Sequence, residues 1–286
     1  MLGPDVRGFM PMFEFTKDRV KSVMNSKLRF AQVAIAFQPI VDATSATVWG
    51  YEALTRGADG RSYPAIVANM DERKRMAFDK LTMLKALREA ARLGLVRHGA
   101  KLTLNVRPTV DRAAVDAAFV ARAAKHYGIP SDSIVLELTE DAKLSCDDFL
   151  KVMAKHRELG ISTGIDDFGS GYSGLNVLAT CGADMVKLDR HLIHDIDKDP
   201  KKQIIVESFA RLCRRLGSVV VAEGVETQRE AEVLREQGIE LMQGYYFGHP
   251  VVGGPSVLRT EIGALAVPRV PSLAVKSWSL PSTMHA

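Results

Sequence analysis

Residues 162–189 read STGIDDFGSGYSGLNVLATCGADMVKLD and contain the pattern that decides the fold. Two short apolar runs, Ser162–Ile165 and Met185–Leu188, flank a longer helical pattern. Short continuous apolar runs are typical of strands that are buried on both faces, and a helix between them is typical of a parallel crossover. Asp166 and Asp167 directly follow the first run. The stretch therefore predicts a strand–helix–strand unit with carboxylates at the carboxyl end of its first strand.

The same alternation continues outward in both directions. Eight strands are predicted, at Ala34–Val41, Thr47–Leu54, Leu102–Val106, Ile134–Leu138, Ser162–Ile165, Met185–Leu188, Val219–Ala222 and Leu241–Met242. Helices are predicted at Ala65–Leu93, Ala113–Tyr127, Cys146–Leu159, Leu175–Cys181, Lys201–Leu216 and Gln228–Gln237, several of them followed by glycine. Only Asp42–Ala46 joins the first two strands, which is too short for a crossover helix, so these strands should form an antiparallel hairpin.

Strands and helices in this order predict an α/β fold, a modified TIM (β/α)8 barrel with an antiparallel first strand. An open, doubly wound sheet is the alternative. No glycine-rich phosphate-binding loop follows a predicted strand, which counts against Rossmann or P-loop chemistry. We expect the barrel domain to span residues 16–263, with a first helix over 16–31 and a short last helix at Ser256–Gly263. Residues 1–15 would be an N-terminal extension and residues 264–286 a flexible C-terminal tail.

Composition excludes several other classes of protein. The chain has 286 residues, of which 47% are hydrophobic and 25% charged, as in ordinary globular proteins. Its longest apolar stretch without a charge, Phe30–Val41, is too short for a membrane span, which needs about 20 residues. The start of the chain has no apolar signal region, and three widely spaced cysteines suit a reducing compartment, so we expect a cytoplasmic protein. A net charge of +4 without a dense basic patch predicts no DNA or RNA partner.

Polar residues stand at the ends of seven successive predicted strands. They are Glu52, Asn105, Glu137, Asp166 with Asp167, Lys187 with Asp189, Glu223, and Gln243. In a barrel the carboxyl ends of the strands meet at one rim, so these side chains should converge. One such residue is often only a turn former or a helix cap, and Asp167 could be a cap. Glu137 lies between apolar neighbours and cannot be one, so its carboxylate needs a partner.

The charge of this cluster predicts a metal site. Five of the converging carboxylates, offset only by Lys187, cannot all stay ionised without cations, and they are Glu52, Glu137, Asp166, Asp167 and Glu223. The ligands are all oxygen atoms, which favours Mg²⁺ or Mn²⁺ over Zn²⁺. The adjacent Asp166 and Asp167 suit a pair of ions, the usual arrangement for in-line attack on a phosphodiester. The glycine-rich segment Phe168–Gly174 is either a lid or a flexible turn, and Arg56 is either a phosphate ligand or a surface residue.

Seven motifs then match a known family in its own order. They are Gln38-Pro39-Ile40-Val41 with Glu52-Ala53-Leu54, Asn105, Glu137-Leu138-Thr139-Glu140, Asp166-Asp167-Phe168-Gly169, Lys187-Leu188-Asp189, Ala222-Glu223-Gly224-Val225-Glu226-Thr227 and Gln243-Gly244-Tyr245. Over about residues 16–255 the chain resembles the EAL domain, the bacterial cyclic di-GMP (c-di-GMP) phosphodiesterase. The resemblance implies hydrolysis of c-di-GMP to linear 5′-pGpG with two Mg²⁺ or Mn²⁺ ions, which would lower the level of this second messenger. It also suggests a homodimer.

The resemblance assigns roles by position. It implies metal ligation by Glu52, Asn105, Glu137, Asp166 and Asp167. It implies catalytic roles for Lys187, which would position water or phosphate, for Glu223, as general base or water-site residue, and for Glu140, which would anchor the loop after Asp167. It implies substrate contacts for Gln38, Leu54, Arg56, Asp189, Gln243 and Pro250. Thr55, Gly57, Arg107 and Gly174 depart from the family pattern, which bears on substrate affinity more than on chemistry.

Two other classes of function stay open at this point. The chain could be a receptor that binds c-di-GMP without cleaving it, or an interaction domain that no longer binds nucleotide. Incubation with c-di-GMP and Mg²⁺ separates the enzyme from both.

Overall fold

The computed structural model describes residues 33–107, 110–139, 145–171, 175, 178–179 and 182–254. The helices predicted at 16–31 and Ser256–Gly263, the predicted N-terminal extension and C-terminal tail, and Glu140 lie outside the described residues. So does most of the helix predicted at Leu175–Cys181.

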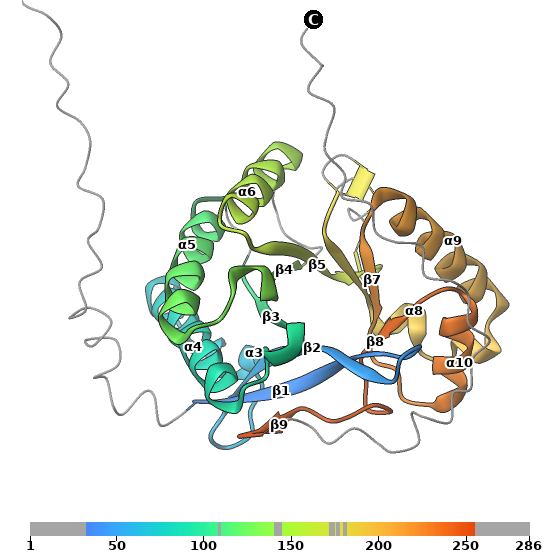
Figure 1. Ribbon diagram of the computed structural model, residues 1–286, viewed down its shortest axis with the longest axis horizontal. Helices are drawn as coiled ribbons and strands as arrows, with labels where there is room; N and C mark the ends of the chain where they lie inside the picture. The colour runs from blue at the N-terminus through green and yellow to red at the C-terminus, as the bar shows by residue number, and fades with distance from the viewer. Residues whose placement is uncertain are drawn as a thin grey trace, which may run out of the picture.

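Eight strands close into a barrel (Figure 1). They are β1 (Val33–Asp42), β2 (Thr47–Gly57), β3 (Lys101–Asn105), β4 (Ile134–Thr139), β5 (Ser162–Phe168), β6 (Met185–Leu188), β7 (Val219–Ala222) and β8 (Leu241–Met242). Strands β2 to β8 pair in sequence order and in parallel, and β1 closes the ring by pairing antiparallel with both β8 and β2. The predicted (β/α)8 barrel with an antiparallel first strand is confirmed, and the open-sheet alternative is wrong. A two-residue strand, β9 (Val251–Val252), also pairs with β1 and was not predicted.

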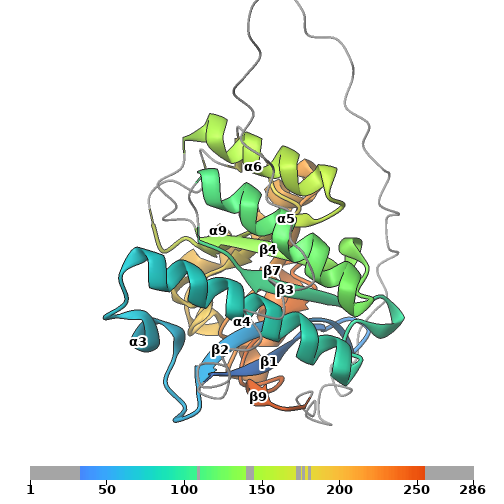
Figure 2. The same ribbon diagram turned by 90° about the vertical axis from the view of Figure 1, so that its left-hand side faces the viewer.

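Helices surround the barrel (Figures 1 and 2). They are α3 (Tyr63–Val67), α4 (Glu72–Leu93), α5 (Val110–Tyr127), α6 (Cys146–Glu158), α8 (Arg190–Ile193), α9 (Pro200–Leu216) and α10 (Gln228–Glu236), with short 3-10 turns η1 (Arg97–Gly99), η2 (Ser131–Ser133) and η3 (Ile196–Lys198). Among the described residues, no helix is long and apolar enough to cross a membrane.

One predicted helix is in fact two. The helical pattern at Ala65–Leu93 is divided into α3 and α4 because the Asp71 side chain accepts a hydrogen bond from the backbone N–H of Lys74 and so caps a new helix. At its other end α4 stops as predicted, at Gly94 in the left-handed conformation with φ of 66°.

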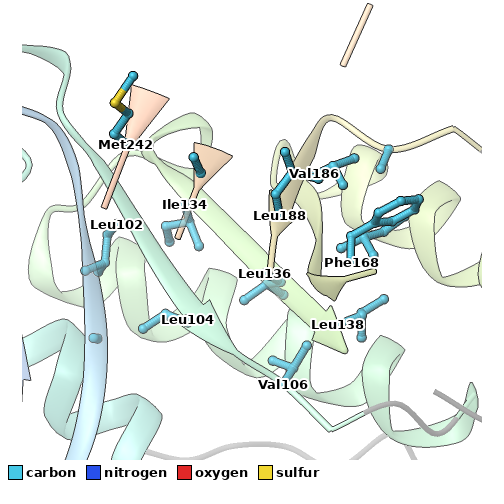
Figure 3. Packing of buried hydrophobic residues seen from close by; sticks show 14 of the residues in the cluster. Leu102, Leu104, Val106, Ile134, Leu136, Leu138, Phe168, Val186, Leu188 and Met242 are labelled. Atoms are coloured by element: carbon cyan, nitrogen blue, oxygen red, sulfur yellow. The ribbon is translucent and has the colours of Figure 1, made fainter. Parts of the chain in front are cut away.

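The core has two parts. Between strands and helices, the outward-facing residues of β3, β4 and β6 form a continuous apolar layer, in which Leu104, Leu136 and Leu188 are buried (Figure 3). Inside the barrel, an apolar plug fills the space below the rim and consists of Ile40, Val135, Met185, Val221 and Leu241. The plug closes the barrel from below, so polar side chains farther along the same strands have access to solvent only from the carboxyl-terminal rim.

Candidate metal centre in the barrel mouth

A polar layer lies directly above the apolar plug and consists of Glu52, Glu137, Asp166, Lys187 and Glu223. Glu137, Lys187 and Glu223 each lie two residues beyond a plug residue on the same strand or at its end, and side chains two residues apart point to the same face. Gly164 makes room for this layer, because a Cβ atom there would lie 3.3 Å from Cγ of Glu137 and 2.9 Å from Cε of Met185.

Lys187 is the centre of the polar layer. Its side chain is 1% exposed, and its Nζ lies 3.2 Å from Glu52 Oε2, 3.3 Å from Glu137 Oε1 and 3.3 Å from Asp166 Oδ1. The same Nζ also forms an ion pair with Glu223. One buried cation therefore faces four carboxylates, and the predicted convergence of strand-end residues is confirmed for these five side chains.

Glu52 has the most complete set of partners. Its Oε1 accepts a hydrogen bond from Asn105 Nδ2 at 2.8 Å, and its Oε2 accepts one from Gln243 Nε2 at 2.7 Å. Gln243 Nε2 also lies 3.2 Å from Gln38 Oε1. Burial acts to raise the pKa of Glu52, but Lys187 and the two amides outweigh it and hold this pKa below its usual range. Glu52 is therefore ionised at neutral pH.

The other carboxyl groups are less well compensated. Burial, together with the charges of their carboxylate neighbours, raises the pKa of Glu137 and of Glu223 well above the usual value, although Lys187 opposes this. Burial likewise raises the pKa of Asp166, and burial and the Asp166 charge raise the pKa of Asp167 to about 6. Burial disfavours the charge of Lys187, but the surrounding carboxylates raise its pKa well above its usual value.

The donor set fits divalent cations. Carboxylate oxygens of Glu52, Glu137 and Asp166 lie within 4.8 Å of one another, and so do those of Asp166, Asp167 and Glu223. Both buried oxygens of Glu137 lack a hydrogen-bond donor among the described residues. Clustered carboxylates with unused acceptor capacity suit hard cations, which prefer oxygen ligands. Asp166 belongs to both clusters.

The backbone has an unusual conformation at Asp167, directly after Asp166. Asp167 has a φ of 55°, in the left-handed region that few residues other than glycine adopt, and its N–H donates to Asp166 Oδ1 at 3.0 Å. Such strained conformations are often found at functional sites.

A cleft of about 480 Å³ opens above the carboxylates. Eight of the residues singled out from the sequence line it: Gln38, Glu52, Leu54, Asn105, Asp166, Asp167, Glu223 and Gln243. Glu137 and Lys187 lie deeper, fully buried. Arg190, Glu226 and Tyr245 also line the cleft, and none of them was predicted as a site residue. Glu226 and Tyr245 lie inside motifs of the family resemblance, and Arg190 directly follows one, so position within or beside a motif was the only signal in the sequence for them.

Three predicted substrate contacts are not among the residues that line the cleft. Arg56 Nη1 donates to the backbone oxygen of Thr55, and Asp189 accepts from the N–H of His191 and so caps α8. Pro250 is half-buried. Their roles, and that of Glu140, stay predictions.

The family model for the EAL domain matches residues 24–250. The chain belongs to the EAL domain family. It is 32% identical to the cyclic di-GMP phosphodiesterase NbdA of Pseudomonas aeruginosa over 243 residues, which are 82% of this chain and 31% of that protein. It is also 32% identical to the probable cyclic di-GMP phosphodiesterase PdeN of Escherichia coli, over 77% of this chain and 44% of that protein. The EAL chain thus spans less than half the length of these curated relatives.

A solved EAL structure has nearly the same extent. A standalone versatile EAL protein from Vibrio cholerae, in its c-di-GMP bound form, superimposes with a TM-score of 0.75 at 36% identity, covering 81% of this chain and 97% of that one. The manganese and cyclic di-GMP complex of Klebsiella pneumoniae BlrP1 at pH 9.0 superimposes with a TM-score of 0.73 at 34% identity, covering 80% and 59%.

The raised pKa of Asp167 predicts how the metal-free protein responds to pH. Between about pH 4 and pH 6 the folded state binds a proton that the unfolded state has lost, so the free energy of unfolding falls as pH rises. Asp167→Asn removes this titration. We expect the variant to match the wild type near pH 4 and to be about 1–2 kcal/mol more stable above pH 6, after allowance for solvent screening. Urea denaturation in chelator measures the free energy of unfolding at each pH. If it depends on pH in the same way in the wild type and the variant, the neighbours of Asp167 do not disfavour its charge.

Proposed function

We propose that the chain is a metal-dependent phosphodiesterase that hydrolyses c-di-GMP to linear 5′-pGpG with Mg²⁺ or Mn²⁺. The observation that carries the proposal is the group of four carboxylates around the buried Lys187, which shares Asp166 and Glu223 with a second acidic cluster under an open cleft. NbdA is a cyclic di-GMP phosphodiesterase, PdeN is a probable one, and both related structures hold c-di-GMP, which supports this substrate. A homodimer and a cytoplasmic location stay predictions.

The two acidic clusters suggest two ions. Glu52, Glu137 and Asp166 would hold one, with Asn105 beside Glu52, and Asp166 and Asp167 would hold the other. Divalent cations bound there would lower the pKa of an attacking water and offset the charge of the phosphate. Gln38, Leu54 and Gln243 line the cleft next to this centre and would contact the substrate.

Two side chains of the protein would handle the proton of the attacking water and the negative charge on the phosphate. Glu223 would accept a proton from the attacking water, because its carboxyl group lines the cleft beside Asp166 and Asp167, and burial raises its pKa and so makes its carboxylate more basic. The oxygen of that water forms a bond to phosphorus in line with the 3′ oxygen, whose bond breaks and which takes up a proton. Lys187 would stabilise the negative charge that grows on the phosphate oxygens, since its pKa keeps it charged.

Metal removal tests the proposal directly. Protein that has been treated with chelator should form no pGpG from c-di-GMP, and added Mg²⁺ or Mn²⁺ should restore turnover, as chromatography of the products would show. Full turnover in excess chelator would refute the mechanism. If c-di-GMP binds in the presence of Ca²⁺, as calorimetry measures, but no pGpG forms with Mg²⁺ or Mn²⁺, the chain is a receptor and the phosphodiesterase proposal is wrong.

A further inference from the structure

Two segments after neighbouring strands form one wall of the cleft. The first follows β6, contains α8 and η3, and carries Arg190. The second follows β7, runs over residues 223–227, and carries Glu223 and Glu226. Both lie on the same side of the barrel as α10 (Figure 1). The shape of this wall depends on how the two segments are held against each other.

An ion pair between side chains of the two segments is exposed to solvent. Arg190 Nη2 lies 2.8 Å from Glu226 Oε1, with side chains 51% and 38% exposed. Exposed ion pairs contribute little to stability, because water screens them. The carbon chain of Arg190 also lies over Gly224, where a Cβ atom would come within 2.6 Å of Arg190 Cγ. Glycine permits this close approach but does not hold the segments together.

A buried carboxylate underneath provides the stronger link. Glu230 is 2% exposed, and its Oε2 accepts hydrogen bonds from the backbone N–H groups of Glu226 and Thr227, both at 2.9 Å. Its Oε1 accepts one from the backbone N–H of Asp195, also at 2.9 Å. Hydrogen bonds to an ionised acceptor are stronger than neutral ones, and a buried carboxylate that loses them is left without solvation. Glu230 therefore joins the main chains of both segments.

The geometry of Asp195 shows how tightly the first segment is held. Its φ of 57° lies in the left-handed region, which is unfavourable for aspartate, and its N–H bonds to Glu230. Ile193 and Ile196, on either side, are fully buried. This part of the segment thus has its backbone fixed by the Glu230 carboxylate and its flanking side chains fixed in the core.

We propose that Glu230 is a positioning residue that fixes Arg190 against Glu223 and Glu226, and so sets the shape of the cleft wall. Its role in turnover rests on the proposed function. Glu230 also belongs to a capping box at the start of α10, in which Thr227 Oγ1 accepts from the Glu230 N–H at 3.2 Å. A capping box alone stabilises only its own helix. The bond to Asp195, 35 residues away in sequence, lies outside the box and is what the proposal depends on.

Two variants separate the link from the cap. Glu230→Gln keeps one carbonyl-type oxygen for the N–H groups of Glu226 and Thr227 but turns an amide donor toward the N–H of Asp195. Thr227→Ala removes the capping hydroxyl and leaves the Glu230 carboxylate intact. We expect amide hydrogen exchange at Asp195 to speed up at least tenfold in Glu230→Gln and to stay within about threefold of the wild type in Thr227→Ala. Unchanged exchange at Asp195 in Glu230→Gln would overturn the proposal.

Steady-state kinetics on the same proteins test the consequence for turnover. Because small displacements of reacting groups reduce rates steeply, kcat for c-di-GMP should fall about tenfold or more in Glu230→Gln, with KM raised as well, and stay within about twofold in Thr227→Ala. If kcat is the same in Glu230→Gln and in Thr227→Ala, Glu230 acts only as a helix cap. If the wild type forms no pGpG, the proposed function fails, while hydrogen exchange at Asp195 still decides whether Glu230 joins the two segments.

Discussion

Lys187→Met is expected to destabilise the metal-free protein by about 3–5 kcal/mol, the range found when one partner of a buried ion pair is removed. Lys187 is the cation that faces Glu52, Glu137, Asp166 and Glu223 in the barrel interior. Methionine keeps most of the side-chain volume but leaves these carboxylates without their counter-charge. Urea denaturation in chelator measures the loss.

The loss of stability in Lys187→Met should depend on pH and on added metal. Without Lys187 the pKa values of the four carboxyl groups rise and these groups take up protons more readily, so the loss of stability should be smaller at pH 5 than at pH 8. Added Mn²⁺ should stabilise the variant more than the wild type, since it replaces the missing positive charge. Hydrolysis should fall at least 100-fold even with Mn²⁺, because the side chain proposed to stabilise charge on the phosphate is then missing.

Lys151→Met is the matched control. Lys151 lies on α6, is 70% exposed and pairs with Asp148. Exposed pairs of this kind contribute at most about 1 kcal/mol. Equal losses of stability in the two variants would mean that Lys187 does not offset the buried charge.

The sequence was sufficient to predict the barrel because its strands are short apolar runs that alternate regularly with helical patterns. The polar layer was predictable for a related reason. A residue such as Glu137, flanked by apolar neighbours within a strand, has to find partners from other strands of the same barrel. The register of the parallel strands then determines which partners it meets, and Asn105 lies opposite Glu137 as its position at a strand end implies.

Features that depend on contacts between distant segments were not predictable in this way. Arg190 lines the cleft only because Gly224, from the next loop, lets its side chain lie close. Glu230 resembles an ordinary capping residue in the sequence, and its bond to Asp195 has no local signal. The division between α3 and α4 had a local signal in Asp71, but the helical periodicity on both sides concealed it.

Glu52→Ala is expected to abolish hydrolysis while the protein stays folded. Among the four carboxylates around Lys187, Glu52 is the one whose pKa lies below its usual range, so it supplies a full negative charge at neutral pH. Its removal takes away a proposed metal ligand and also releases Asn105 and Gln243, whose amides both donate to it. A variant that keeps more than about a tenth of the wild-type rate, a barrier change below about 1.4 kcal/mol, would show that Glu52 is not a metal ligand.

Stability without metal separates the role of Glu52 in the site from a role in folding. The variant loses hydrogen bonds, but the repulsion between Glu52 and its carboxylate neighbours also disappears, and the pKa values of Glu137 and Asp166 should fall as a result. We therefore expect the melting temperature in chelator to be close to that of the wild type or above it, and the rise on adding Mn²⁺ to be largely lost. Asp59→Ala, which removes an exposed carboxylate paired with Arg61, should leave both the rate and the Mn²⁺ response unchanged. A Glu52→Ala protein that gains as much stability from Mn²⁺ as the wild type would place the ion elsewhere, because a cation that binds only the folded state stabilises it more when it binds more tightly.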